Sequence, residues 1–110
     1  MSIASDLPWI NQAIQFDREE KYTECIDLII RRIDAMLRDG KFKKVNDLVS
    51  AIDTEKASLH FIIAMLSATR SALDYLPSRL SFYERSYLRA ERDGIDPEKL
   101  IGGLRGRPRI

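Results

Sequence analysis

The sequence predicts an all-α fold, and two patterns carry that prediction. Apolar residues recur at intervals of three and four in nearly every segment, and no segment alternates apolar and polar residues with a period of two. The chain has 110 residues, 45% of them hydrophobic, so it suits one packed core and is too short for two typical domains. We expect five main helices packed as antiparallel hairpins, in a bundle or a short α-solenoid, over residues 1–101. A basic tail follows over residues 102–110.

The first helix is predicted from its start signal and from one apolar face. Asp6 can cap a helix that has Pro8 in its first turn, where the missing N–H of proline would have no partner in any case. Charged residues at 17–21 then mark a turn. The residues on the apolar face are Leu7, Ile10, Ala13 and Ile14.

The next two helices have the clearest periodicity. The second begins at Tyr22 and continues until Gly40 ends it, and the third runs from Phe42 to Ile52. The apolar stripe of the second contains Tyr22, Cys25, Ile26, Ile29, Ile33, Met36 and Leu37, and that of the third contains Phe42, Val45, Leu48, Val49 and Ile52.

The fourth helix is predicted over residues 55–75, with Asp53 or Thr54 as its cap. It is apolar on almost every side between Leu59 and Ala68. A helix of this kind is buried on all sides, so we expect it to be the central helix or one that is covered in a dimer.

A fifth helix follows the proline at position 77, because the residue before a proline is pushed out of the helical conformation. It begins at Ser78 or at Ser81, and Gly94 ends it. A short sixth helical turn starts near Asp96. The stripe predicted for the fifth helix is Leu80, Tyr83, Tyr87 and Ala90.

A short internal repeat links the second and third helices. Six residues of the second helix recur twenty positions later, and they are Lys21, Tyr22, Cys25, Asp27, Leu28 and Ile29 in the first copy and Lys41, Phe42, Val45, Asp47, Leu48 and Val49 in the second. Together with Leu37 and Gly40, residues 21–52 resemble the helix-to-helix junction of tetratricopeptide-like repeats, which implies stacked helix hairpins. The chain as a whole also resembles small all-α proteins of unassigned function from bacteria and phages, and that resemblance implies no function.

The side chains that usually carry chemistry are few. Cys25 lies on an apolar stripe, which indicates a buried hydrophobe rather than a reactive thiol, and His60 is the only histidine. Glu20, Glu24 and Asp27 share a helical face where carboxylates could bind a divalent cation or act as an acid and base pair. No second helix offers a matching set, so we expect a solvated acidic face, no metal, no cofactor, no catalytic residue and no enzymatic activity.

The charge of the chain is unevenly divided. Residues 1–101 carry a net charge of −2, which gives no electrostatic reason to expect nucleic acid on the helical body, whereas residues 102–110 carry +3. The tail resembles the core of the AT-hook motif, although Leu104 stands where that motif usually has proline. The resemblance implies that an extended Arg-Gly-Arg segment lies in the narrow minor groove of A·T-rich DNA. The residues concerned are Arg105, Gly106, Arg107, Pro108 and Arg109.

Taken together, these features favour a non-enzymatic module that acts through protein–protein contact, as a homodimer or as a small subunit of a larger assembly. The alternative is a DNA-associated accessory protein that is anchored by its tail, and such a tail also suits docking on an acidic protein or a solubilising role only. We expect no membrane span, because the longest apolar run has six residues, and we take a cytoplasmic location as the default. No small-molecule substrate is evident from the sequence. The expected interface residues are Phe61, Met65, Tyr83 and Tyr87.

The AT-hook interpretation predicts that the tail alone confers binding to A·T-rich duplex DNA. Fluorescence anisotropy should show weak binding of the full chain that is lost as salt rises, because the affinity comes mainly from three arginines and phosphates. A chain that ends at Gly103 should not bind, and a G·C-rich duplex of the same length serves as the control. Equal affinities of the two chains for the A·T-rich duplex would remove the interpretation.

Overall fold

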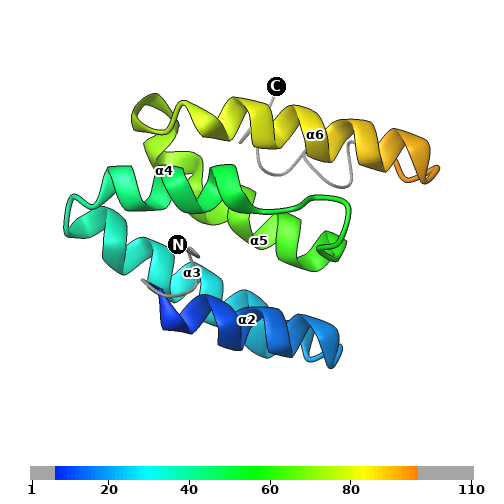
Figure 1. Ribbon diagram of the computed structural model, residues 1–110, viewed down its shortest axis with the longest axis horizontal. Helices are drawn as coiled ribbons and strands as arrows, with labels where there is room; N and C mark the ends of the chain where they lie inside the picture. The colour runs from blue at the N-terminus through cyan, green and yellow to red at the C-terminus, as the bar shows by residue number, and fades with distance from the viewer. Residues whose placement is uncertain (1–6, 97–110) are drawn as a thin grey trace, which may run out of the picture.

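The computed structural model describes residues 7–96. Within this range it contains five α-helices, one 3-10 helix and no strand, which confirms the predicted all-α fold (Figure 1). The predicted sixth helical turn and the tail lie outside the described residues. The elements are α2 (Pro8–Arg18), α3 (Tyr22–Arg38), α4 (Phe42–Ala51), α5 (Leu59–Thr69), the 3-10 helix η1 (Arg70–Tyr75) and α6 (Ser78–Arg92).

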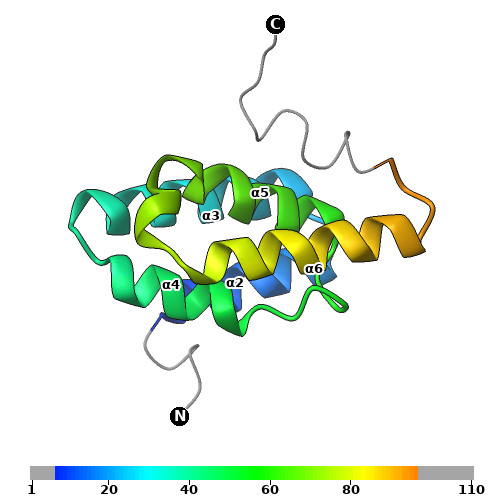
Figure 2. The ribbon, with the colours of Figure 1, turned by 90° about the horizontal axis from the view of Figure 1, so that it is seen from above.

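The helices stack from one edge of the molecule to the other. α2 packs on α3 at one edge, α3 also packs on α4 and α5, and α6 covers α4 and α5 at the opposite edge (Figures 1 and 2). Consecutive helices run antiparallel, as the predicted hairpins require. Every main helix except the two at the edges therefore has neighbours on several sides.

Three helix ends share one backbone arrangement. In each, a residue with positive φ turns the chain, and the next N–H reaches back five residues to a carbonyl at 2.8 to 2.9 Å. This is the Schellman arrangement, which supplies donors to carbonyls that the end of a helix leaves without a partner. The turning residues are Glu20, Gly40 and Gly94, and the bonds run from Lys21 to Phe16, from Lys41 to Met36 and from Ile95 to Ala90.

Two of these turns open the two copies of the internal repeat. Residues 21–30 and 41–50 show the same order of buried and exposed positions, so the repeat in sequence is also a repeat in local structure. Glu20 has a φ of 60° where Gly40 has 74°. A side chain in this left-handed conformation costs roughly 1–2 kcal/mol, which glycine avoids. The arrangement thus persists in the first copy without the glycine that favours it.

α5 is the central helix, as predicted. It packs against α3, η1 and α6, and the side chains of Phe61, Ile62, Met65 and Leu66 are at most 2% exposed. Its apolar surface is therefore covered by the rest of the same chain. No dimer is needed to explain why this helix is apolar on almost every side.

The predicted start of this helix is wrong. α5 begins at Leu59, and the hydroxyl of Ser58 caps it by accepting a hydrogen bond from the Phe61 N–H at 3.1 Å. Asp53 and Thr54, which were expected to cap it, instead lie in a non-helical segment between α4 and α5. We call this segment, residues 52–58, the linker.

The far end of α5 also departs from the prediction, because residues 55–75 do not form one α-helix. The Thr69 hydroxyl donates a hydrogen bond to the carbonyl of Met65 at 2.7 Å, and the chain then tightens into η1. Ala72 has a φ of −118°, outside the helical range, within this 3-10 segment. A threonine that bonds back to the preceding turn commonly bends a helix, which accounts for the change at this point.

Arginine side chains of α6 hold the carbonyls of the linker. Arg85 donates to the carbonyl of Ile52 at 3.0 Å. Arg89, whose side chain is only 16% exposed, donates to the carbonyl of Thr54 at 2.5 Å and to that of Ala57. Buried backbone carbonyls need such partners. The two guanidinium groups therefore supply the hydrogen bonds that a helix or strand would otherwise give this segment.

The hydrogen bonds from Arg85 and Arg89 to the linker set the rotation of α6 about its own axis. Part of the predicted apolar stripe is therefore wrong. Phe82, Ser86 and Ala90 are fully buried, whereas Leu80, predicted to face the core, is 66% exposed. Arginines at positions 85 and 89 must face the linker, and this turns the side of the helix with Leu80 toward solvent. Ser86 is compatible with the core because its hydroxyl donates to the Phe82 carbonyl at 2.7 Å.

Two helix N-termini depend on side chains from other helices. Asp17 of α2 accepts hydrogen bonds from the N–H of Ser58, at 3.2 Å, and from its hydroxyl, which in turn caps α5. Asn46 of α4 accepts a hydrogen bond from the N–H of Ser78, at 2.8 Å, where α6 begins. The bonds from Asp17 to Ser58 and from Asn46 to Ser78 therefore form only when the helices have docked.

The contacts of Arg89 predict a large loss of stability when its guanidinium is removed. We expect Arg89→Met to lower the free energy of unfolding by about 2 to 3 kcal/mol, because two partly buried carbonyls lose a charged donor while the aliphatic stem is retained. Urea denaturation followed by circular dichroism measures the change.

The matched control is Arg92→Gln, which removes an arginine that pairs with Glu55 at the exposed end of the same helix. Exposed ion pairs contribute little, so this variant should unfold close to the wild type. Equal losses in the two variants would contradict the role assigned to Arg89.

Candidate functional site

The predicted residues of the tail, Arg105 to Arg109, lie outside the described residues. The DNA interpretation therefore stays a prediction. The four predicted interface residues are all described, and they divide into two pairs. Phe61 and Met65 are 2% and 0% exposed in the core of the single chain, so they present no surface to a partner in this fold. Tyr83 and Tyr87 are half-buried on α6.

An apolar surface remains where η1 meets the start of α6. Leu73 and Leu80 are 51% and 66% exposed, and with Pro77 and Tyr83 they line a shallow hollow of about 560 Å³. We call these four residues the η1–α6 face. The sequence contained the signal for it, since Leu80 and Tyr83 belong to the predicted stripe. That stripe was assigned to the core, and the structure places part of it at the surface.

Arg79 lies at the base of this hollow and is already engaged. Its Nε donates to the Thr69 hydroxyl at 2.9 Å, and its terminal nitrogen donates to the carbonyl of Leu66 at 2.8 Å. Burial, with the nearby charge of Arg70, lowers the pKa of the Arg79 guanidinium. Arg79 thus fastens the end of α5 to α6 and contributes to the shape of the η1–α6 face.

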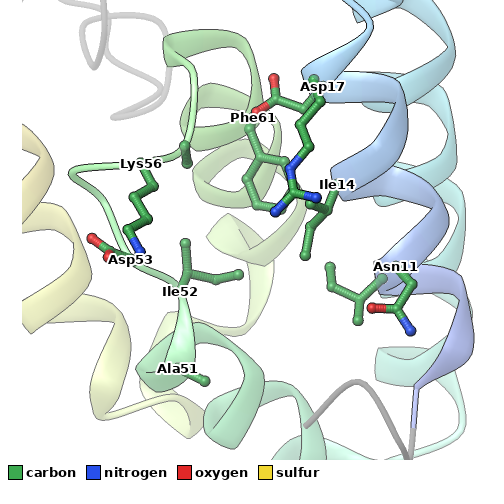
Figure 3. Close-up of a pocket in the computed structure, with 11 residues that line it drawn as sticks. Asn11, Ile14, Asp17, Ala51, Ile52, Asp53, Lys56 and Phe61 are labelled. Carbon is green, nitrogen blue, oxygen red and sulfur yellow. The ribbon is translucent and has the colours of Figure 1, made fainter. Parts of the chain in front are cut away.

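A second hollow, a cleft of about 360 Å³, separates α2 from the linker (Figure 3). Ile14 of α2 and Ile52 of the linker point into it from opposite walls, with Phe61 of α5 between them. Charged side chains stand around this apolar interior. The lining residues are Ile10, Asn11, Ile14, Asp17, Arg18, Ala51, Ile52, Asp53, Lys56, Ala57 and Phe61.

The acidic face of α3 shows no assembled chemical site. Asp27 pairs with Arg31 at 3.4 Å on the exposed surface, and residues 7–96 contain no group of three side chains placed to hold a metal ion. His60 stacks on Tyr22, with 4.0 Å between the ring centroids. Burial, with the nearby carboxylate of Asp17, raises the pKa of the Cys25 thiol to about 11, so this thiol is protonated at neutral pH.

The two ends of α3 carry opposite charge, which the net charge of the body conceals. Residues 17–27 contain five acidic and two basic side chains, whereas residues 31–47 contain six basic and three acidic ones. At the basic end, Arg32, Lys41 and Lys44 line a hollow beside Trp9 and make no ion pair within the described chain. Asp39 lines the same hollow, so an acidic side chain stands among these three cations.

Comparison with protein families, curated proteins and solved structures finds no match to this chain. None of the helices within residues 7–96 combines the length and the apolar character that a membrane span needs.

Proposed function

We propose that this protein is a non-enzymatic interaction module that self-associates through the η1–α6 face. The observation that carries the proposal is the location of its exposed apolar side chains. Five large hydrophobic side chains are exposed among the described residues, four of them on η1 and α6, and two of these four, Leu73 and Leu80, belong to the η1–α6 face. Clustered exposed apolar surface is typical of protein contact sites. The other two are Tyr75, whose ring stacks on Phe42 of α4, and Leu88, further along α6.

The position of α6 favours a second copy of the chain as the partner. Within the stack, α5 covers α3 and α6 covers α4, but among the described elements no helix covers the outer side of α6. A second α6, related by a two-fold axis, would continue the stack and would bring the same apolar side chains from both copies together. Such isologous contacts are the commonest in symmetric oligomers.

The buried polar groups also fit a structural use. Thr69 and Ser86 are at most 1% exposed, and each hydroxyl donates to a carbonyl one turn earlier in its own helix. The buried Thr54 has its carbonyl bound by Arg89. The hydroxyls of Thr69 and Ser86 and the carbonyl of Thr54 thus each have a partner, which supports a role in packing rather than in catalysis.

The proposal predicts that a charge on the η1–α6 face prevents self-association. Sedimentation velocity at increasing protein concentration should show a monomer–dimer equilibrium for the wild type. Leu80→Glu should raise the dissociation constant at least about tenfold, because a carboxylate would be buried against apolar side chains. Circular dichroism should show an unchanged helix content, since Leu80 is mostly exposed.

Thr23→Glu is the matched control, because it adds the same charge at an exposed position of α3. It should dimerise as the wild type does. A wild type that stays monomeric at high concentration, or a Leu80→Glu variant with an unchanged dissociation constant, would refute self-association through this face.

A further inference from the structure

The cleft between α2 and the linker has the features of a ligand site, and it shares no residue with the η1–α6 face. It exists because α2 packs mainly on α3 and makes few contacts with α4, which leaves a gap above α5. Its volume of about 360 Å³ lies within the usual range of small-molecule sites, roughly 300–1,000 Å³.

The interior of the cleft is suited to an apolar group. Ile10, Ile52 and Phe61 are buried at its base, and Ile14 and Ala57 are half-buried along its walls. A ligand that displaces water from these side chains gains the hydrophobic contribution of the area it covers. The interior alone does not specify which polar group such a ligand would carry.

The charged side chains at the rim of the cleft indicate which polar group the ligand carries. Both carboxylates are already bound, since Asp17 accepts from the N–H and the hydroxyl of Ser58 and Asp53 accepts from the N–H of Glu55 at 2.9 Å. The two cations, Arg18 from α2 and Lys56 from the linker, have no hydrogen bond or ion pair with any described residue. The charged rim groups that have no partner among the described residues are therefore both positive.

We propose that this cleft binds a small amphipathic anion, a medium-chain or aromatic carboxylate. Its apolar body lies between Ile14 and Ile52 above Phe61, and its carboxylate is held at the rim by Arg18 and Lys56. Hydrogen bonds between a cationic donor and a carboxylate are stronger than neutral ones, so the rim selects for negative charge. Because both cations stand at the surface, this selectivity weakens as salt rises.

Isothermal titration calorimetry with decanoate, below its critical micelle concentration, tests the proposal on the full chain. Decanoate should bind, and decyltrimethylammonium, with an apolar chain of the same length and a positive head, should bind at least about tenfold more weakly. The double variant Arg18→Gln with Lys56→Gln should lose this preference for the anion. Lys43→Gln, which removes an exposed lysine outside the cleft, should keep it.

A variant that fills the cleft tests the location. Ala51→Phe places a ring at an exposed lining position, so the fold should be retained and decanoate binding should be lost. The Leu80→Glu variant should bind decanoate as the wild type does, which keeps this test separate from self-association. Binding that survives Ala51→Phe, equal affinity for the two amphiphiles, or no binding of decanoate by the wild type would each overturn the proposal.

Discussion

The structure depends on the hydrogen bonds that α6 makes to the linker. The linker joins α4 to the central helix without forming a helix or strand, and its carbonyls are partly enclosed. Arg85 and Arg89 reach it from more than thirty residues away in sequence and supply the missing donors. An arginine suits this task because its planar guanidinium presents several donors in fixed directions. Docking of α6 and ordering of the linker are thus one event.

The η1–α6 face and the cleft between α2 and the linker both follow from that event. The linker forms one wall of the cleft, so the positions of Ile52 and Lys56 depend on its carbonyls being held. The same bonds fix the rotation of α6 and leave Leu80 at the surface. Asp17 links the two regions further, because it caps Ser58 from the opposite side of the linker. A single set of polar contacts therefore shapes an apolar face and a charged cleft.

Local signals explain which parts of the fold could be predicted from the sequence. α3 and α4 were expected within about two residues of their bounds, because glycine, apolar spacing and the repeat act within a few residues of one another. The rotation of α6 could not be predicted in this way. Its sequence contains two competing stripes, one through Leu80 and one through Phe82, and the choice between them is made by carbonyls of a distant segment. The cap at Ser58, by contrast, is a local bond from the Phe61 N–H, and it was missed because Asp53 and Thr54 are also capping residues and lie just upstream of the same apolar run.

The cleft could not be predicted from local sequence patterns either. Its walls come from residues 10–18 and 51–61, and no spacing within either segment indicates that they face one another. Its net preference for an anion also depends on which charges are already bound, and the bond between Asp17 and Ser58 spans 41 residues. The sequence showed that α5 is apolar on almost every side. Whether these side chains are covered within one chain or by a second copy depends on how the helices pack, which the sequence pattern does not indicate.

Residue-resolved hydrogen exchange by NMR tests the central dependence most directly. Within the linker, the N–H groups of Lys56 and Ala57 donate to the carbonyl of Asp53. In Arg89→Met the exchange rates of these two amide protons should rise at least about tenfold more than the loss in the global free energy of unfolding accounts for. The exchange rates of the α3 amide protons should rise only by the factor that this global loss predicts. Linker and α3 amides that change by the same factor would show that the linker keeps its order without α6, and would contradict the account.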